Sequence, residues 1–249
     1  MPFTFSHPAI VLPLAKINQK YISTTALVAG SMAPDFEYFV NMRMMQVHGH
    51  TIPGMFYYDL PMAIIMCFLF HYAVRDAIIK YSPITLKREL NEYYGYNWMD
   101  RFKSHWHVVI LSAIIGIASH LFWDSFTHEG RYFVDLIPFL QESTSFGGAT
   151  LKNSHIAQLL SSLVGAILVL ICSCAPSLDS IRKQKFIYIG IYWGLVSIIA
   201  IVILLLRGNL NISNFIATSI AGGLIGMMLA PLIMKWLKIE RKVFHKESN

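Results

Sequence analysis

Long apolar runs, rather than a short-period alternation of apolar and polar positions, dominate the hydrophobic pattern of this chain. A helix that spans a bilayer needs about 20 largely apolar residues. Five segments meet this requirement, namely 56–79, 105–127, 155–175, 186–206 and 212–234. The pattern therefore predicts an all-α, polytopic membrane helix bundle with about five transmembrane helices, which forms a single domain over residues 1–249.

The first 55 residues have a different pattern, with apolar pieces that are too short to span a bilayer. These pieces cover 8–15 and 22–33, and prolines interrupt them at Pro8, Pro13 and Pro34. Proline in a helix interior removes a backbone hydrogen bond and crowds the preceding turn. We therefore expect short N-terminal helices that pack on one face of the bundle or re-enter it.

Composition supports a membrane protein, and the charge distribution gives its orientation. The chain is 55% hydrophobic and 14% charged, whereas soluble domains are about one quarter charged. The basic residues behind the net charge of +6 concentrate in 80–104, 176–185 and the tail 235–249. Basic loops of membrane proteins face the cytoplasm. We therefore expect a protein of the cytoplasmic (inner) membrane with no nucleic-acid partner, a cytoplasmic tail, and outward-facing segments 1–55 and 128–154.

Candidate chemistry lies at the outer end of the second predicted span, in "SHLFWDSFTH". His120, Asp124 and His128 follow one another at intervals of four, which places them on nearly one face of a helix. Histidine and aspartate are ligands for zinc and similar divalent ions, and a carboxylate between two histidines can bridge two ions. The alternative is a His–Asp hydrogen bond that joins helices, although ionisable groups at such depth are costly and usually functional.

Further polar side chains belong to the same predicted membrane side as this helix end. They are His7, Asp35, Glu37, His48 and His50 before the first span, and Arg131 after the second. Topology and ligand chemistry, two independent arguments, thus place these groups at one membrane surface. By contrast, we interpret His71, Arg75 and Asp76, near the inner end of the first span, as a structural ion pair.

Four segments in order carry a resemblance to a known family: "MPFTFSHPAIVLPL", "GSMAPDFEYF", "GHTIPGMFYYDLP" and "SHLFWDSFTH". They resemble an uncharacterised bacterial multi-pass membrane family catalogued as domain of unknown function 4184. That family is in turn similar to membrane-bound metal-dependent hydrolases and, more distantly, to the helical zinc-dependent phospholipase C and nuclease superfamily. The resemblance covers residues 1–130 strongly and the later spans by hydropathy and length.

The resemblance implies a set of metal ligands. Asp35, His50, His120 and Asp124 would hold one ion, His7 would share Asp124 with a second ion, and His128 would contribute to a third. His50 rather than His48 is the favoured ligand, because "GHTIPG" is the family-like context. Two departures weaken the further sites: the chain has no tryptophan near its start, and His155 is followed four residues later by Leu159 rather than by a carboxylate.

The function that this resemblance implies is a membrane-bound, metal-dependent hydrolase of the phosphoesterase type. The expected cofactor is a divalent metal, zinc, and the expected substrate is a membrane lipid or lipid-linked phosphoester at the outer face. Asp35 or Glu37 would serve as general base, and Arg131 would contact an anionic oxygen.

Two non-enzymatic alternatives remain open. One is a structural metal that pins the N-terminal segment to the bundle. The other is a cation transporter or binding protein, which the lack of charge inside the spans of 155–234 disfavours. The small residues of 222–230, "GGLIGMMLA", permit close helix packing either within one chain or between chains of a homo-oligomer.

Overall fold

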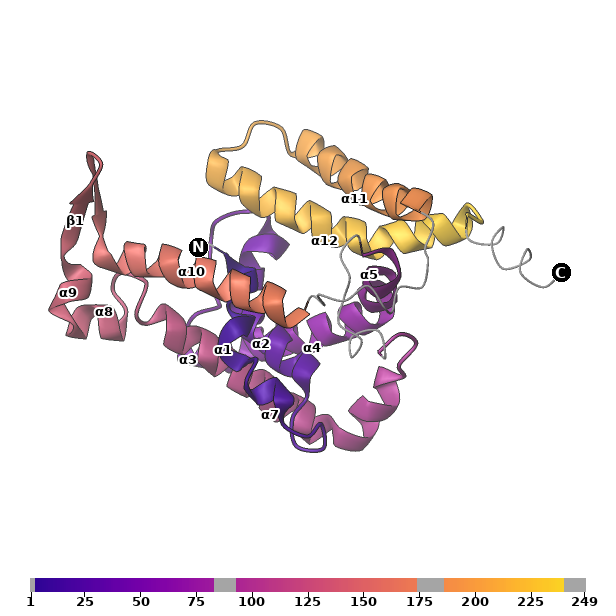
Figure 1. Cartoon of the computed structure of the whole chain (residues 1–249), viewed down its shortest axis with the longest axis horizontal. Helices are drawn as coiled ribbons and strands as arrows, with labels where there is room; N and C mark the ends of the chain where they lie inside the picture. Colours follow the sequence, from indigo (N-terminus) through magenta and orange to yellow (C-terminus); the bar gives the residue numbers. More distant parts are fainter. Residues whose placement is uncertain (1–2, 83–92, 174–185, 240–249) are drawn as a thin grey trace. The chain divides into compact units, whose positions relative to one another are not determined.

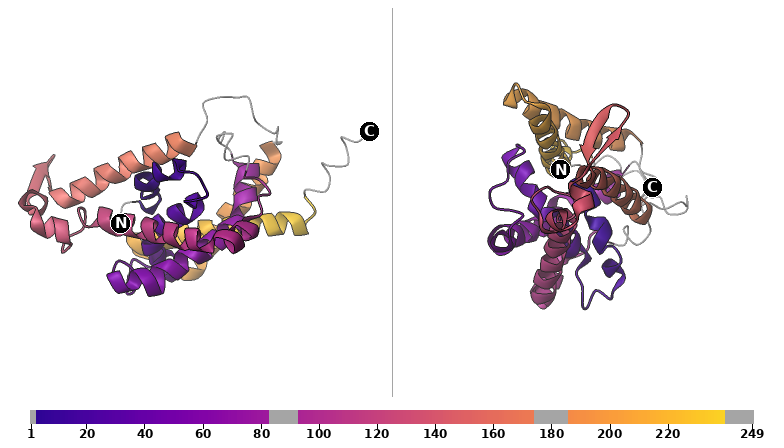
Figure 2. Two further views of the ribbon diagram at one scale, coloured as in Figure 1. Left: turned by 90° about the horizontal axis from the view of Figure 1, so that it is seen from below. Right: turned by 90° about the vertical axis from the view of Figure 1, so that its left-hand side faces the viewer.

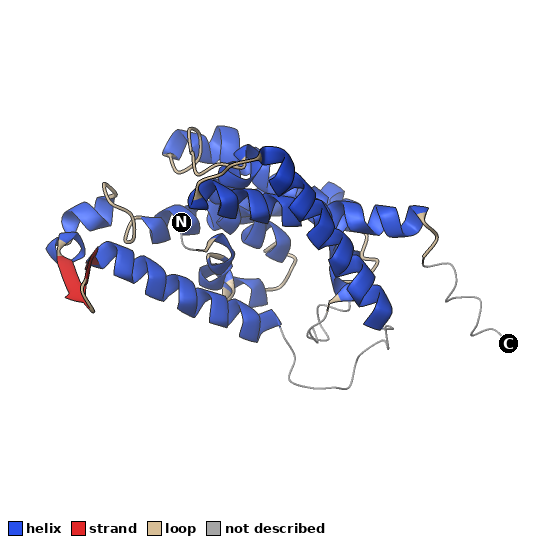
Figure 3. Cartoon of the chain, turned by 90° about the horizontal axis from the view of Figure 1, so that it is seen from above, coloured by secondary structure: helices blue, strands red, loops and turns tan. Residues whose placement is uncertain are grey.

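The fold is almost entirely helical in the computed structural model, which describes residues 3–82, 93–173 and 186–239 (Figures 1 and 3). Within these residues, five helices are long and apolar enough to cross a membrane: Ile52–Tyr81, Trp98–Asp124, Asn153–Ser173, Phe186–Arg207 and Ile212–Trp236. They agree with the five spans that the apolar runs predict. This confirms the all-α, multi-pass architecture and indicates a membrane-embedded protein.

The chain forms two compact units. One contains residues 1–36, 47–67 and 98–173, and the other contains residues 37–46, 68–97 and 174–249. All the residues of the candidate centre described below belong to the first unit.

The N-terminal region begins with short turns, as expected, and continues into a helix that is longer than expected. The turns are η1 (Thr4–Ser6), α1 (Pro8–Val11) and η2 (Leu14–Lys16), followed by α2 (Thr24–Asn41). We expected the piece 22–33 to end before Pro34, but α2 continues through this proline. Ala26, Leu27 and Ala33 are fully buried, and such packing outweighs the one backbone hydrogen bond that proline removes.

The first candidate span consists of five consecutive helical pieces. They are α3 (Ile52–Gly54), the π-helical turn η3 (Met55–Asp59), α4 (Leu60–Leu69), a second π-helical turn η4 (Phe70–Val74), and α5 (Arg75–Tyr81). The Thr51 side chain caps the start by accepting a hydrogen bond from the Gly54 backbone N–H. This cap ends the turn that carries His50 and begins the helix.

Helix α7 (Trp98–Asp124) is kinked at His105 and crosses α2 at very short range. A Cβ atom added to Gly30 would lie 2.2 Å from the Ala113 carbonyl oxygen, and one added to Gly116 would lie 2.3 Å from that of Leu27. The two backbones can therefore approach this closely only because both positions are glycine. The crossing brings Ser31 and Asp35, which follow Gly30 on α2, next to the last two turns of α7.

Residues 125–152 link α7 to α10 (Asn153–Ser173) through short elements that the sequence did not predict. These are α8 (Tyr132–Leu136), α9 (Pro138–Gln141) and an antiparallel hairpin of β1 (Ser143–Phe146) and β2 (Ala149–Lys152). Gly147 and Gly148 both have positive φ, which a two-residue hairpin turn of this kind requires. Figure 2 shows this segment at the ends of α7 and α10 that it connects.

In the second unit, α11 (Phe186–Arg207) and α12 (Ile212–Trp236) pack along each other. A Cβ atom added to Gly222 would lie 2.9 Å from Ala200, and one added to Gly226 would lie 2.8 Å from the Val196 carbonyl oxygen. These two glycines therefore serve packing within the chain. No atom of the described chain lies within 4 Å of a Cβ atom added to Gly223.

The predicted ion pair of Arg75 and Asp76 is present in the first span. The Arg75 guanidinium donates to Asp76 Oδ1 over 2.7 Å and to the Tyr96 carbonyl over 2.7 Å, and its Nη1 lies 3.0 Å from His71 Nδ1. By contrast, most of the basic residues used to predict topology, including Lys87, Arg182 and Lys242, lie outside the described residues. The predicted orientation therefore stays a prediction.

Candidate metal centre

The first unit brings all six predicted metal-ligand residues together from separate parts of the chain. His7 immediately precedes α1, Asp35 lies on α2, His50 lies in the turn before α3, His120 and Asp124 lie on the last two turns of α7, and His128 follows it. His7, Asp35, His50, His120 and Asp124 are all buried. Among the described residues, two overlapping sets could hold a metal ion: His7, Asp35 and His120; and His50, His120 and Asp124.

Three ligand atoms lie in one tight group, Nε2 of His50, Nε2 of His120 and Oδ2 of Asp124, and Oδ1 of Asp35 approaches the two histidine nitrogens. The His50 nitrogen is 3.0 Å from that of His120 and 2.9 Å from Asp124 Oδ2. The His120 nitrogen is 3.3 Å from Asp124 Oδ2. Asp35 Oδ1 is 3.6 Å from the His50 nitrogen and 3.7 Å from the His120 nitrogen. Ligands of a tetrahedral zinc ion, at bond lengths of about 2.0–2.1 Å, are about 3.3 Å apart, so the spacing of His50, His120 and Asp124 fits three ligands of such an ion.

A hydrogen bond to the backbone fixes which nitrogen of His120 can bind a metal ion. His120 Nδ1 lies 2.7 Å from the Ser31 carbonyl oxygen, which can only accept, so Nδ1 carries the proton. In a neutral ring, Nε2 then directs its lone pair at the Asp124 carboxylate, which is repulsive. A second proton on His120, a proton on His50 Nε2, which lies 3.0 Å away, or a metal ion removes this repulsion. A metal-binding histidine usually donates the N–H of its other ring nitrogen to a backbone carbonyl or a carboxylate, as His120 Nδ1 does here.

Asp35 and Asp124 each present a defined oxygen to the group. Thr4 Oγ1 donates to Asp35 Oδ2 over 2.7 Å, so the other oxygen of Asp35 faces the two histidines. Asp124 uses both oxygens: Oδ2 faces His50 and His120, whereas Oδ1 is 3.8 Å from His7 Nε2 and 3.5 Å from His128 Nδ1. Its carboxylate therefore has the geometry of a bridge between two histidine pairs.

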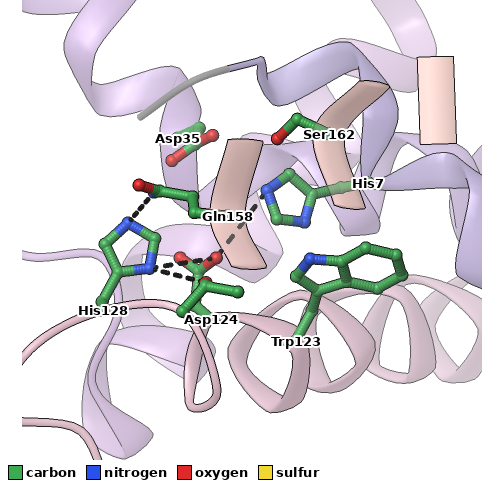
Figure 4. A pocket seen from close by; sticks show the side chains of 8 residues that line it. His7, Asp35, Trp123, Asp124, His128, Gln158 and Ser162 are labelled. Carbon is green, nitrogen blue, oxygen red and sulfur yellow. Dashed lines mark hydrogen bonds and ion pairs between the residues drawn. The ribbon is translucent and has the colours of Figure 1, made fainter. Parts of the chain in front are cut away.

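A small pocket opens on the Oδ1 side of Asp124 (Figure 4). It has room for about one water-sized group. The lining residues are His7, Asp35, Trp123, Asp124, Thr127, His128, Gln158 and Ser162. Gln158 Nε2 lies 2.7 Å from His128 Nε2, so the carboxamide and the Asp124 carboxylate hold the two sides of the His128 ring.

His7 is held by ring contacts rather than by hydrogen bonds. Its ring stacks on that of His120 at 3.8 Å between centroids and meets the Trp123 indole at 70°. His7 Nδ1 is buried without a hydrogen-bond partner among the described residues. Burial is the main cause that lowers the pKa of His7 to about 4, and burial also lowers the pKa of His128. His7 is therefore neutral at pH 7, the form that a metal ligand requires.

The structure brings His50, and not His48, into the group. His48 is exposed, with Nδ1 3.3 Å from the Tyr57 hydroxyl and its ring stacked on Tyr58. His50 has a φ of +59°, a left-handed conformation that costs a non-glycine residue about 1 kcal/mol or more. Arg131 Nη1 donates to the His50 carbonyl over 2.7 Å and so stabilises this turn.

Glu37 is buried but belongs to neither ligand set and does not line the described pocket. Residues two apart on a helix project from different faces, so α2 directs Glu37 away from the face that carries Asp35. Among the described residues, the structure thus separates the two acids that the sequence offered together as general bases.

Several residues that contribute to the centre were not identified from the sequence. Thr4, Ser31, Trp123 and Gln158 position the ligand side chains, and Ser162 lines the pocket. Gln158 had a signal, because it is a polar residue inside an apolar run. Ser31 had none, because its contribution is a backbone carbonyl.

Comparison with known proteins gives one family and no further relative. The family model described as "Domain of unknown function (DUF4184)" matches residues 1–234. No curated protein and no solved structure is found to be similar to this chain.

Proposed function

This chain belongs to the DUF4184 family, and we propose that it is a metal-binding membrane protein whose centre binds zinc through His50, His120, Asp124 and Asp35. The observation that carries the proposal is the three-atom group of His50, His120 and Asp124. Its interatomic distances of 2.9–3.3 Å suit three ligands of one tetrahedral ion, and Asp35, 3.6 Å and 3.7 Å from the two histidine nitrogens, is the proposed fourth ligand. Because His120 Nδ1 donates to the Ser31 carbonyl, His120 Nε2 is left to bind the ion.

A second ion would use the other oxygen of Asp124, with His7 Nε2 and His128 Nδ1. With Asp35 bound, the first site would have four protein ligands, as closed structural sites do, whereas the second site would have three and adjoins the pocket. A site with three protein ligands keeps a position for water or substrate, as catalytic zinc sites do. The geometry therefore favours the second site for chemistry.

The reaction we propose is hydrolysis of a lipid or lipid-linked phosphoester at the outer face of the cytoplasmic membrane. A bound divalent ion supplies an acidified water and polarises a phosphoryl oxygen. Asp35 lines the pocket, so it would serve as general base in preference to Glu37 wherever it is not bound to the first ion. Arg131 Nη1 donates to the His50 carbonyl. The other N–H groups of Arg131 are proposed to donate to an anionic oxygen of the substrate.

A purely structural metal is the second candidate function, since a first site completed by Asp35 would keep no open position. An ion bound there would join α2 and the His50 turn to α7, and the Thr4 hydrogen bond to Asp35 would add the N-terminal segment. Structural zinc contributes folding free energy directly. This function requires no hydrolysis.

Metal content of the purified full-length chain tests the proposal. We expect about one to two ions per chain in the wild type, none in Asp124→Ala, and loss of the second ion only in His128→Ala. His48→Ala is the matched control and should keep the wild-type content, since His48 is exposed and outside the group. A wild-type chain without stoichiometric divalent metal would refute metal binding in every form.

Activity then separates the two candidate functions. The metal-loaded protein, in detergent and in vesicles, is assayed against a panel of phospholipids and phosphodiesters. Hydrolysis that His128→Ala abolishes while the first ion stays bound would support the enzyme. Full metal occupancy with no hydrolysis of any compound in the panel would refute the enzyme and support the structural metal.

A further inference from the structure

The segment that follows the candidate centre is firmly attached to the first unit through polar contacts. We call residues 129–142 the α8–α9 segment, since it contains both short helices. At its start, Arg131 donates to the His50 carbonyl, and the Val134 N–H donates to the Ser125 carbonyl. Val134 itself is buried. The start of the segment is thus tied to the turn of His50 and to the end of α7.

Asn153, the first residue of α10, holds the other end of the segment. Its backbone N–H donates to the Glu142 carbonyl over 2.9 Å, and its side-chain amide donates to the Phe139 carbonyl over 2.8 Å. Asn153 Oδ1 also accepts from Thr144 over 2.6 Å, which ties in the hairpin. Asn153 is buried. The segment therefore has a defined position on the unit.

The opposite side of the segment presents three large apolar side chains. Tyr132 is 71% exposed, Leu136 is 60% exposed and Phe139 is 64% exposed. Short elements fixed by buried polar contacts do not need such side chains for their own folding. Large apolar side chains exposed within eight residues of one another mark a surface that another phase or molecule covers.

We propose that the α8–α9 segment lies in the interfacial layer of the bilayer and inserts Tyr132, Leu136 and Phe139 among the lipids. Continuity carries this assignment: α7 ends at Asp124 and α10 begins at Asn153, both are long and apolar enough to span a membrane, and the segment connects them. A connection between two spans lies at the membrane surface. Aromatic side chains with aliphatic neighbours are characteristic of that layer.

The charge of the segment shows what kind of lipid contact it makes. It contains three acidic side chains and one basic one, a net charge of −2, so anionic headgroups do not attract it. Insertion of the apolar side chains is the remaining source of attraction, and a neutral lipid such as phosphatidylcholine suffices. Because Arg131 connects the segment to His50, the insertion also sets the depth of the candidate centre relative to the headgroups.

Site-specific photocrosslinking tests the proposal on the full chain in phosphatidylcholine nanodiscs. We place p-benzoylphenylalanine in place of Phe139, where it substitutes one aromatic ring for another, and separately in place of Leu136. The matched control carries the same group in place of Ser145, an exposed residue of the polar hairpin. After irradiation, intact-protein mass spectrometry measures the adducts.

We expect a phosphatidylcholine adduct at 139 and at 136, and several-fold less of it at 145. Equal lipid adducts at 139 and 145, or no lipid adduct at 139 and 136, would overturn the proposal. A crosslinked dimer at 139 in place of the lipid adduct would also overturn it and assign the surface to a second copy of the chain. The result does not depend on metal binding, so it stands apart from the test of the proposed function.

Discussion

Asp124 is the residue on which the candidate centre depends, because its two carboxylate oxygens face different pairs of histidines. Its spacing from His120 and His128 was readable from the sequence, since intervals of four define one helix face. The choice between His48 and His50 needed the structure, because only the left-handed turn at His50 directs that ring to Asp124. Gln158 was overlooked, since it lies 30 residues from the histidine it contacts.

Replacement of Gln158 by leucine should weaken binding of the second ion and leave the affinity for the first ion unchanged. The carboxamide orients the His128 ring, and loss of such an orienting contact typically lowers metal affinity about 10- to 100-fold. Competition with a chromophoric chelator measures both affinities. Gln141→Leu makes the same chemical change on α9, outside the centre, and should have wild-type affinities. Unchanged binding of the second ion in Gln158→Leu would show that the carboxamide has no orienting role.

At the scale of the elements, the crossing of α2 and α7 determines whether the ligands meet. The apolar runs predicted α7 well but shortened α2, because local rules treat Pro34 as the end of a helix. Gly30 and Gly116 allow the two backbones into contact, and this places Ser31 against His120 and Asp35 beside the same ring. Glycines in apolar segments suggest close packing, but the sequence does not tell which helices they join.

A methyl group at the crossing should therefore destabilise the protein and disturb the centre together. In Gly116→Ala the new Cβ atom would lie 2.3 Å from the Leu27 carbonyl oxygen, so the helices must separate. We expect a loss of about 1–3 kcal/mol in the free energy of unfolding and weaker metal binding. Thermal unfolding in detergent, with metal analysis, measures both effects.

Gly194→Ala on α11 is the matched control, because its Cβ atom would meet nothing within 4 Å. Alanine has a higher helix propensity than glycine by about 1 kcal/mol, so this variant should be equally stable or slightly more stable. If Gly116→Ala behaved in the same way as Gly194→Ala, the close crossing would not limit stability.

For the whole molecule, the five long apolar helices and the loop charges lead to one orientation in the membrane. The five helices are present among the described residues, whereas much of the basic charge lies outside them. The orientation argument thus rests on the positive-inside rule applied to the sequence. It places the His/Asp centre and the hairpin outside and the tail inside.

Labelling of intact cells with a membrane-impermeant thiol reagent tests this orientation, in a background without the three native cysteines. Ser143→Cys on the hairpin should react from outside, because segment 128–154 is predicted to face outward. Lys238→Cys, just after α12, should react only after the membrane is permeabilised. The reverse result at both positions would place the candidate centre on the cytoplasmic side.

The sequence by itself determined the helical membrane class, the five spans and one wall of the candidate centre. These properties are local: span length follows from consecutive apolar residues, and the common face of His120, Asp124 and His128 follows from helix periodicity. Only the tertiary structure decided that His7, Asp35 and His50 join that wall, that Glu37 does not, and that Gln158 supports His128. Such contacts join residues 15 to more than 100 positions apart, and backbone crossings that no local pattern encodes bring them together.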